Sequence, residues 1–245
     1  MSFQFQIGRY FVLVMAILAS GQLSAQSARA LFSTDSGTKM SNQSTEKKPE
    51  KHVTQKTSYA GLQYTIFQRL DQEKSVKVSP SKKFKTGDQI KVVVTSNKKG
   101  ILTAINISSD GEISVLSEQS LKAGAEVTVP SKGFLKFVGK TGVEQLIFVL
   151  SEAPFSKQKQ VSNNIVESLS EACGSKNVAT RGLVVDDAAG NQFSVLDNSG
   201  KCGAPSASTR SLVVEIEEDS GYGVLPVGDL NAGALLTLKL KLVHE

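Results

Sequence analysis

Short apolar segments dominate the chain after residue 58 and predict β-strands. In the first of them, Leu62, Tyr64, Ile66 and Gln68 share one parity, which places three apolar side chains on one face of a strand. The later segments have the same character, and they cover residues 76–78, 89–95, 101–107, 113–116, 126–129, 134–138, 145–150, 182–185, 192–196, 211–216 and 234–242. Short strands at this spacing are typical of antiparallel sandwiches and barrels.

Turn residues separate these strands, and one segment breaks the strand pattern. Residues 86–88 and 109–111 each contain Gly and Asp, which suit tight turns, and we expect Asp88 to accept hydrogen bonds from local amides. Within residues 157–173, the apolar residues have helical spacing and predict a helix that covers the core; they are Val161, Ile165, Leu169 and Ala172. The pattern therefore predicts an all-β, antiparallel, immunoglobulin-like β-sandwich over residues 59–245, with one helix and a loop insertion in its C-terminal half.

Residues 1–30 have the pattern of an export signal. Arg9 precedes an apolar run over residues 10–19, and small and polar residues follow. The run has about ten residues, whereas a membrane-spanning helix needs about twenty, so a retained N-terminal anchor is the weaker alternative. Cleavage after Ala30 fits the A-x-A pattern better, and cleavage after Ala25 lies closer to the apolar run. We therefore expect an exported protein, periplasmic or extracellular, with no transmembrane segment in the mature chain.

Residues 31–58 form a polar segment that is rich in Ser, Thr, Lys, Gln and Asn. After Phe32, its only larger apolar residues are Met40 and Val53. Such a segment buries too little apolar surface to offset the entropy of ordering, so we expect a disordered linker.

The two cysteines, Cys173 and Cys202, are predicted to form a disulfide, because isolated pairs in an oxidising compartment usually do. Two buried free thiols are the alternative. A metal site at the cysteines is not expected, since they are far apart in sequence and the only histidines are His52 and His244. The acidic residues at 186–187 and 217–219 leave calcium binding by exposed loops open as an alternative to solvated loops.

No catalytic or cofactor-binding residues are predicted from the sequence. A hydrolase site would have to use His244, the penultimate residue; we expect His244 instead to complete a terminal strand with a satisfied hydrogen bond, so that its replacement costs little stability. Residues 74–99 contain eight lysines and one acidic residue, Asp88, which allows contact with an anionic polymer. Phe84 is the only aromatic residue there, so a stacking platform for nucleic acid is missing and a solvated face is favoured.

Several short motifs also occur in a fixed order. They are Gly61-Leu62-Gln63-Tyr64, Phe84-Lys85-Thr86-Gly87-Asp88, Asn97-Lys98-Lys99-Gly100-Ile101-Leu102, Gly111-Glu112-Ile113-Ser114-Val115-Leu116, Val129-Pro130, Gly142-Val143-Glu144-Gln145-Leu146 and Ser151-Glu152-Ala153-Pro154. In this order, residues 59–155 resemble a bacterial family known only as a domain of unknown function, DUF4384, and residues 240–244 are similar to the end of its small exported members. The resemblance implies an exported or accessory β-domain and no catalytic residues.

These observations predict three regions: a signal peptide over residues 1–30, a linker over 31–58 and a β-sandwich domain over 59–245. The expected function is that of a non-enzymatic module, without cofactor or metal, that contacts another protein in the bacterial envelope or outside the cell. No nucleic-acid partner is expected. The alternatives are an envelope hydrolase that uses His244 and a binding module for an anionic envelope polymer.

Overall fold

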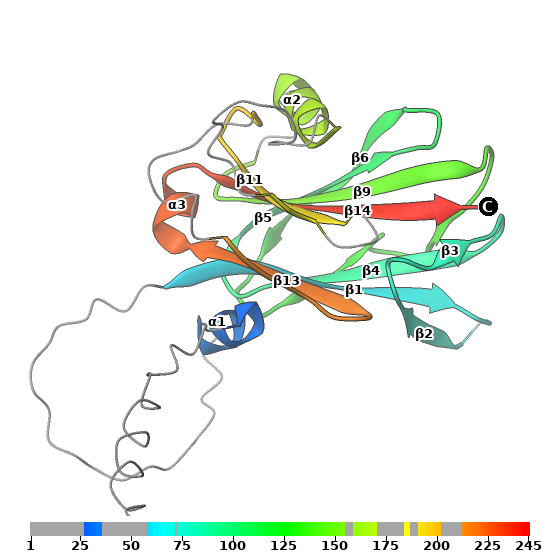
Figure 1. Ribbon diagram of the computed structural model, residues 1–245, viewed down its shortest axis with the longest axis horizontal. Helices are drawn as coiled ribbons and strands as arrows, with labels where there is room; N and C mark the ends of the chain where they lie inside the picture. The colour runs from blue at the N-terminus through cyan, green and yellow to red at the C-terminus, as the bar shows by residue number, and fades with distance from the viewer. Residues whose placement is uncertain are drawn as a thin grey trace, which may run out of the picture.

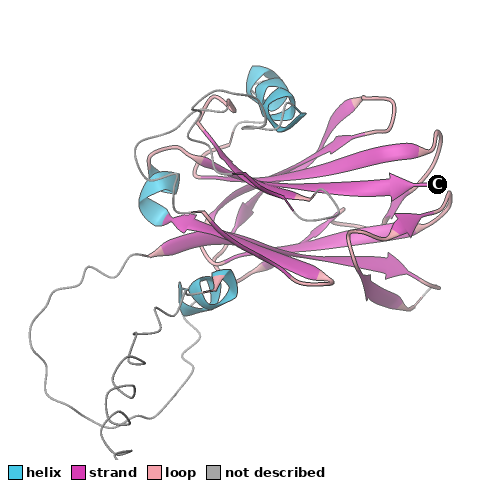
Figure 2. Ribbon diagram, viewed as in Figure 1, coloured by secondary structure: helices cyan, strands magenta, loops and turns pink. Residues whose placement is uncertain are grey.

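The computed structural model describes residues 27–35, 58–71, 73–154, 159–170, 184–186, 191–201 and 212–245. In these ranges, two sheets of seven strands each pack face to face (Figures 1 and 2). All strand pairs are antiparallel except one. This arrangement confirms the predicted all-β sandwich.

The first sheet has the strand order β12-β13-β1-β4-β7, with β2 paired to β1 and β8 paired to β4. Its strands are β1 (Tyr59–Arg69), β2 (Ser75–Val78), β4 (Gln89–Ser96), β7 (Glu126–Val129), β8 (Leu135–Lys136), β12 (Val213–Ile216) and β13 (Ser220–Pro226). The predicted parity of β1 is confirmed, because Leu62, Tyr64 and Ile66 are fully buried between the sheets.

The second sheet has the order β10-β11-β14-β9-β5-β6, and β3 pairs in parallel with the end of β14. Its strands are β3 (Lys83–Phe84), β5 (Gly100–Ile107), β6 (Ile113–Leu121), β9 (Gly142–Ser151), β10 (Val184–Asp186), β11 (Gln192–Leu196) and β14 (Leu235–His244). The long alternating segment predicted at the C-terminus is therefore a central strand, β14, between β11 and β9.

In the described part of the chain, three helices lie outside the sheets: α1 (Ala28–Asp35), α2 (Lys159–Ser170) and α3 (Val227–Asn231). Helix α2 covers the outer face of the second sheet, where Ile165 and Leu169 pack with Ile147 and Val149 (Figure 1). This confirms the predicted core-covering helix, although the side chain of Val161 and residue Ala172 lie outside the described part of the chain. None of the described helices is both long and apolar enough to cross a membrane.

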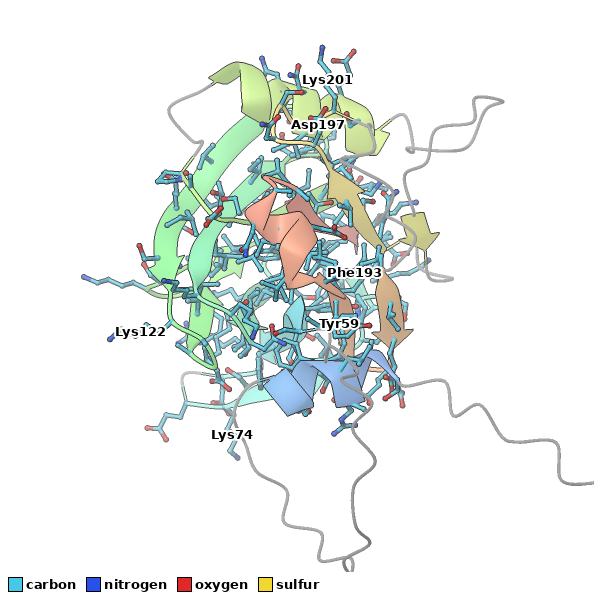
Figure 3. All side chains as sticks on the ribbon, turned by 90° about the vertical axis from the view of Figure 1, so that its left-hand side faces the viewer. Tyr59, Lys74, Lys122, Phe193, Asp197 and Lys201 are labelled. Atoms are coloured by element: carbon cyan, nitrogen blue, oxygen red, sulfur yellow. The ribbon has the colours of Figure 1, made fainter. Side chains whose placement is uncertain are left out.

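Two glycines of β13 make room for the largest aromatic side chains of the core. Gly221 lies beneath the ring of Tyr64, and Gly223 lies beneath the ring of Phe193. Phe193 comes from β11 of the second sheet and is buried between the two sheets (Figure 3). A Cβ atom on Gly223 would lie 2.3 Å from Cδ1 of Phe193, and one on Gly221 would lie 2.5 Å from Cε1 of Tyr64. The sequence did not predict β13, because glycines at alternate positions resemble turn chemistry more than a strand.

Helix α1 lies on the outer face of the first sheet, at the boundary drawn between the predicted signal peptide and linker (Figure 1). Ala28, Leu31 and Phe32 are buried there against Tyr222 and Val224 of β13. The structure thus differs from the predicted linker at residues 31–35, which are helical, because three apolar residues at helical spacing meet an apolar sheet face. Residues 36–57 of that linker lie outside the described ranges.

Candidate functional site

The candidate hydrolase residue, His244, ends the central strand β14 inside the sandwich. It pairs with Gly142 of β9 and with Phe84 of β3. Because alternate residues of a strand face the same side, His244 continues the inward row formed by Leu238, Leu240 and Leu242. Only 2% of the residue is exposed, so the histidine is enclosed by the fold.

A hydroxyl and a carboxyl group flank the imidazole of His244. Its Nε2 atom shares a hydrogen bond of 2.9 Å with Oγ1 of the exposed Thr86. Its Nδ1 atom lies 3.7 Å from Oε1 of Glu144, which is longer than a hydrogen bond, and makes none within the described residues. The predicted satisfied hydrogen bond is therefore confirmed for one of the two ring nitrogens.

The turn that carries Thr86 is fixed by the Phe84-x-x-Gly87-Asp88 motif. Gly87 has a φ of +95°, and its N–H donates to the carbonyl of Phe137 at 2.9 Å. The Asp88 carboxylate accepts a hydrogen bond of 2.9 Å from the N–H of Lys85, as predicted for a turn aspartate. The ring of Phe84 stacks on that of Phe137 at 4.7 Å, and the Phe137 ring lies 5.4 Å from the imidazole of His244. The motif therefore supports the histidine from one side.

Burial raises the pKa of the Glu144 carboxyl above its ordinary value. The neighbouring His244 acts in the opposite direction, and the charge of Asp110 adds to the increase. The environment of Glu144 thus favours the neutral carboxyl.

We expect Glu144→Gln to alter how stability depends on pH. Because the folded pKa of Glu144 is raised, its favourable contribution to stability is present below its ordinary pKa of 4.5 and is lost as pH rises through the folded value. Urea denaturation between about pH 4 and about pH 7 should show that the stability of wild type relative to E144Q decreases with rising pH. The same substitution at the exposed Glu112 is the control. A difference between wild type and E144Q that does not change with pH would contradict this account.

A small pocket of about 110 Å³ adjoins Glu144 between the sheets. Asn106, Lys136 and Glu144 provide its polar lining, and the remaining lining residues are apolar: Ile90, Leu116, Leu135, Phe137, Leu146 and Leu242. Pockets for small-molecule ligands usually have about 300 Å³ or more. Thr86 and His244 are not among the residues that line this pocket.

Strand β6 forms an open edge of the second sheet. Among the described strands it pairs only with β5, and its first four residues are exposed. Three of them are large and apolar: Ile113, Val115 and Leu116 are 44%, 43% and 37% exposed. Ile113 and Val115 lie opposite Ile107 and Ile105, which belong to the apolar cluster beneath α2. The outer apolar surface of this sheet therefore continues to an unpaired edge.

The lysine-rich region around residues 74–99 has local partners of its own. The ammonium group of Lys91 lies 5.6 Å from the ring centre of Phe67 and 5.5 Å from that of Phe134. Lys83 forms an ion pair with Glu245. Phe84 is fully buried and presents no ring to a ligand.

The remaining predicted site residues are only partly described. Cys173, Cys202 and Asp187 lie outside the described residues, as does the side chain of Asp186. In the other acidic loop, Glu217 forms an ion pair with Arg29 at 2.7 Å and accepts a hydrogen bond from Ser220. The described ranges contain no group of three or more residues suited to hold a metal ion.

Asn97 has a structural role that the sequence analysis did not identify. Its fully buried side chain accepts a hydrogen bond of 2.8 Å from the N–H of Gly61. Its Nδ2 atom donates to the carbonyls of Phe32, at 3.2 Å, and Tyr59, at 3.1 Å. Asn97 thus joins α1 to the start of β1. The only available signal was its place as the first residue of the Asn97-x-x-Gly100 motif.

The fold and these features define a two-sheet β-sandwich with an enclosed terminal histidine and an open edge strand. A family model described as "Domain of unknown function (DUF4384)" matches residues 83–154. This match confirms, over residues 83–154, the resemblance that the motifs indicated. It covers β3 to β9, with the Phe84-x-x-Gly87-Asp88 turn, Asn97 and Glu144, and it begins after β1. No curated protein and no solved structure matches the chain.

Proposed function

We propose that this protein is an exported, non-enzymatic β-sandwich module that binds another envelope or secreted protein through the edge strand β6. The observation that carries the proposal is the exposure of Ile113, Val115 and Leu116 on an edge that no other described strand covers. Edge strands are commonly protected by Lys, Pro, inward-pointing charges or β-bulges. Residues 113–117 contain no Lys, Pro or charged residue, and their one protective feature is the bulge in the pairing with β5 between Val115 and Ser117. The occupant that fits is an extended apolar segment of the partner, which would add a strand to the sheet and place alternate side chains on its apolar face.

Export rests on the sequence. The charged residue, apolar run and small residues of positions 1–30 form the order that an export signal requires. The compartment that follows is the periplasm or the cell exterior, where the partner would be encountered.

Site-specific photo-crosslinking in living cells tests the β6 edge. A photoreactive residue at Val115 should form a discrete crosslinked species with another protein, whereas one at Val76 on β2 should not. The two positions are matched, since they are 43% and 40% exposed. Equal capture at positions 115 and 76, or none at 115, would contradict the proposal.

A charge placed on the same edge provides the second arm of this experiment. With the photoreactive residue moved to the neighbouring Ile113, the substitution Val115→Lys should abolish capture, because a lysine on an edge strand opposes the addition of a further strand. The urea midpoint should be retained, since the side chain of Val115 is exposed. Undiminished capture by the lysine variant would show that the partner does not bind along β6.

A hydrolase is the second candidate function, because the imidazole of His244 lies between the hydroxyl of Thr86 and the carboxyl group of Glu144. A hydroxyl, an imidazole and a carboxyl group in this sequence are the components of a catalytic triad. We expect no such activity, because the imidazole is enclosed and the small pocket beside it does not include Thr86. Purified protein and its His244→Gln variant should be compared on peptidoglycan, peptide and ester substrates. A turnover that the substitution abolishes would overturn the non-enzymatic proposal.

We further expect Cys173 and Cys202 to be joined in the exported protein. Closing a loop of about thirty residues stabilises the fold by roughly 3–4 kcal/mol in the chain-entropy model. Peptide mapping without reductant should recover the linked pair, and reduction should increase hydrogen exchange in residues 157–205 before it does so in residues 59–150. Two thiols that alkylate freely in protein from the exported fraction would exclude the bridge.

A further inference from the structure

Helix α1 bears directly on where the export signal is removed. Cleavage after Ala30 would divide this helix, whereas cleavage after Ala25 would leave it whole. We propose that the signal is cleaved after Ala25 and that residues 28–32 then act as an N-terminal clamp on the first sheet. The inference rests on the proposed export of the protein.

The first turn of α1 contributes to the apolar contact with the sheet. Ala28 is 1% exposed and belongs to the same buried cluster as Leu31, Phe32, Tyr222 and Val224. The ring of Phe32 meets that of Tyr222 edge to face at 5.8 Å. A chain that began at Leu31 would lack Ala28 and leave part of this sheet face uncovered.

The first turn of α1 also makes polar contacts with the first sheet. The guanidinium of Arg29 forms an ion pair of 2.7 Å with Glu217 and lies 5.8 Å from the ring centre of Tyr222. The backbone N–H of Arg29 donates to the carboxylate of Glu215 at 3.0 Å, an acceptor of favourable charge for a helix N-terminus. Both carboxylates come from the region of β12, so the first turn connects α1 to that edge of the sheet.

The helix also has its own start signal before residue 31. Oγ of Ser27 accepts a hydrogen bond of 3.2 Å from the N–H of Ala30, which is the contact of an N-cap residue. The carbonyl of Ser27 accepts the first helical hydrogen bond, from the N–H of Leu31, at 3.0 Å. Cleavage after Ala30 would remove the cap and the first turn and leave only residues 31–35, which are too few for a stable helix.

The N-terminus of the exported protein tests the inference. Intact mass and N-terminal sequencing of protein from the exported fraction should give a chain that begins at Gln26, as free or cyclised glutamine. A chain that begins at Leu31 would overturn the cleavage site and leave export intact. A chain that retains Met1 in the membrane would overturn cleavage, and one that retains Met1 in the cytosol would overturn the proposed export as well.

Two matched substitutions provide an independent test. Ala25→Lys should block processing, because it replaces the small residue before the proposed cleavage site, whereas Ala30→Lys lies beyond that site and should be processed like wild type. Ala30 is on the exposed side of α1, so the lysine should leave the clamp intact. The reverse pattern would overturn the inference.

Purified chains that begin at Gln26 and at Leu31 should also differ in stability, and the shorter chain should unfold at a lower urea concentration. Equal unfolding midpoints would contradict the clamp.

Discussion

The variant Gly223→Ala is expected to lower the free energy of unfolding by about 3 kcal/mol, at the upper end of the cost of overpacking a core. The added Cβ would lie 2.3 Å from Cδ1 and 2.6 Å from Cε1 of Phe193, so the ring has to move. Phe193 is fully buried between the sheets and cannot turn towards solvent (Figure 3). Urea denaturation followed by circular dichroism measures the loss.

Gly228→Ala is the matched control, because a Cβ at that position would meet no atom within 4 Å. The double variant Gly223→Ala, Phe193→Leu should lose less stability than the sum of the two single changes, since a smaller side chain at position 193 makes room for the added methyl group. Strict additivity, or an equal cost at Gly228, would show that the close approach of the ring is not the cause.

Asn97→Ala is expected to lower the free energy of unfolding by a similar amount, about 2–4 kcal/mol, because it leaves three backbone groups without the hydrogen bonds that Asn97 makes. These groups are the N–H of Gly61 and the carbonyls of Phe32 and Tyr59. Each unsatisfied buried group costs about 1–3 kcal/mol, and relaxation of the structure recovers part of this. Hydrogen exchange should increase most in α1 and in the first residues of β1.

The exposed Asn231→Ala serves as the control for this experiment and should change neither stability nor exchange in α1. If Asn97→Ala reduces stability without a local increase in exchange at α1, the asparagine does not join the helix to the sheet in the way its hydrogen bonds indicate.

Much of the fold could be predicted because the alternation of apolar and polar residues along a strand shows which side chains are buried. Along β4, inward Ile90, Val92 and Val94 alternate with less buried neighbours, and the predicted segment 192–196 coincides with β11. The elements that were not predicted depend on distant partners. The glycines of β13 are required because the rings of Tyr64 and Phe193 lie over them, and these residues are distant in sequence. Helix α1 is likewise stabilised by a surface that is distant in sequence, since Arg29 and its partner Glu215 are 186 residues apart.

The cluster at the end of β14 was predictable only in part. The sequence placed His244 in a terminal strand, which β14 confirms. Its partners, Thr86 and Glu144, come from a turn and from a different strand, and no local pattern connects them to the C-terminus. The family motifs include both Thr86 and Glu144. Their meeting at His244 depends on the pairing of β14 with β3 on one side and with β9 on the other.

The two hydrogen bonds that Asn97 donates limit how far a group attached ahead of α1 can lie from the sandwich. Its Nδ2 atom holds the carbonyls of Phe32 in α1 and Tyr59 in β1 side by side, so α1 stays next to the start of β1. Anything attached ahead of α1 therefore stays close to the first sheet. The edge strand β6 belongs to the second sheet, so an attachment at the N-terminus and a partner at β6 can be accommodated on one molecule at the same time (Figure 1).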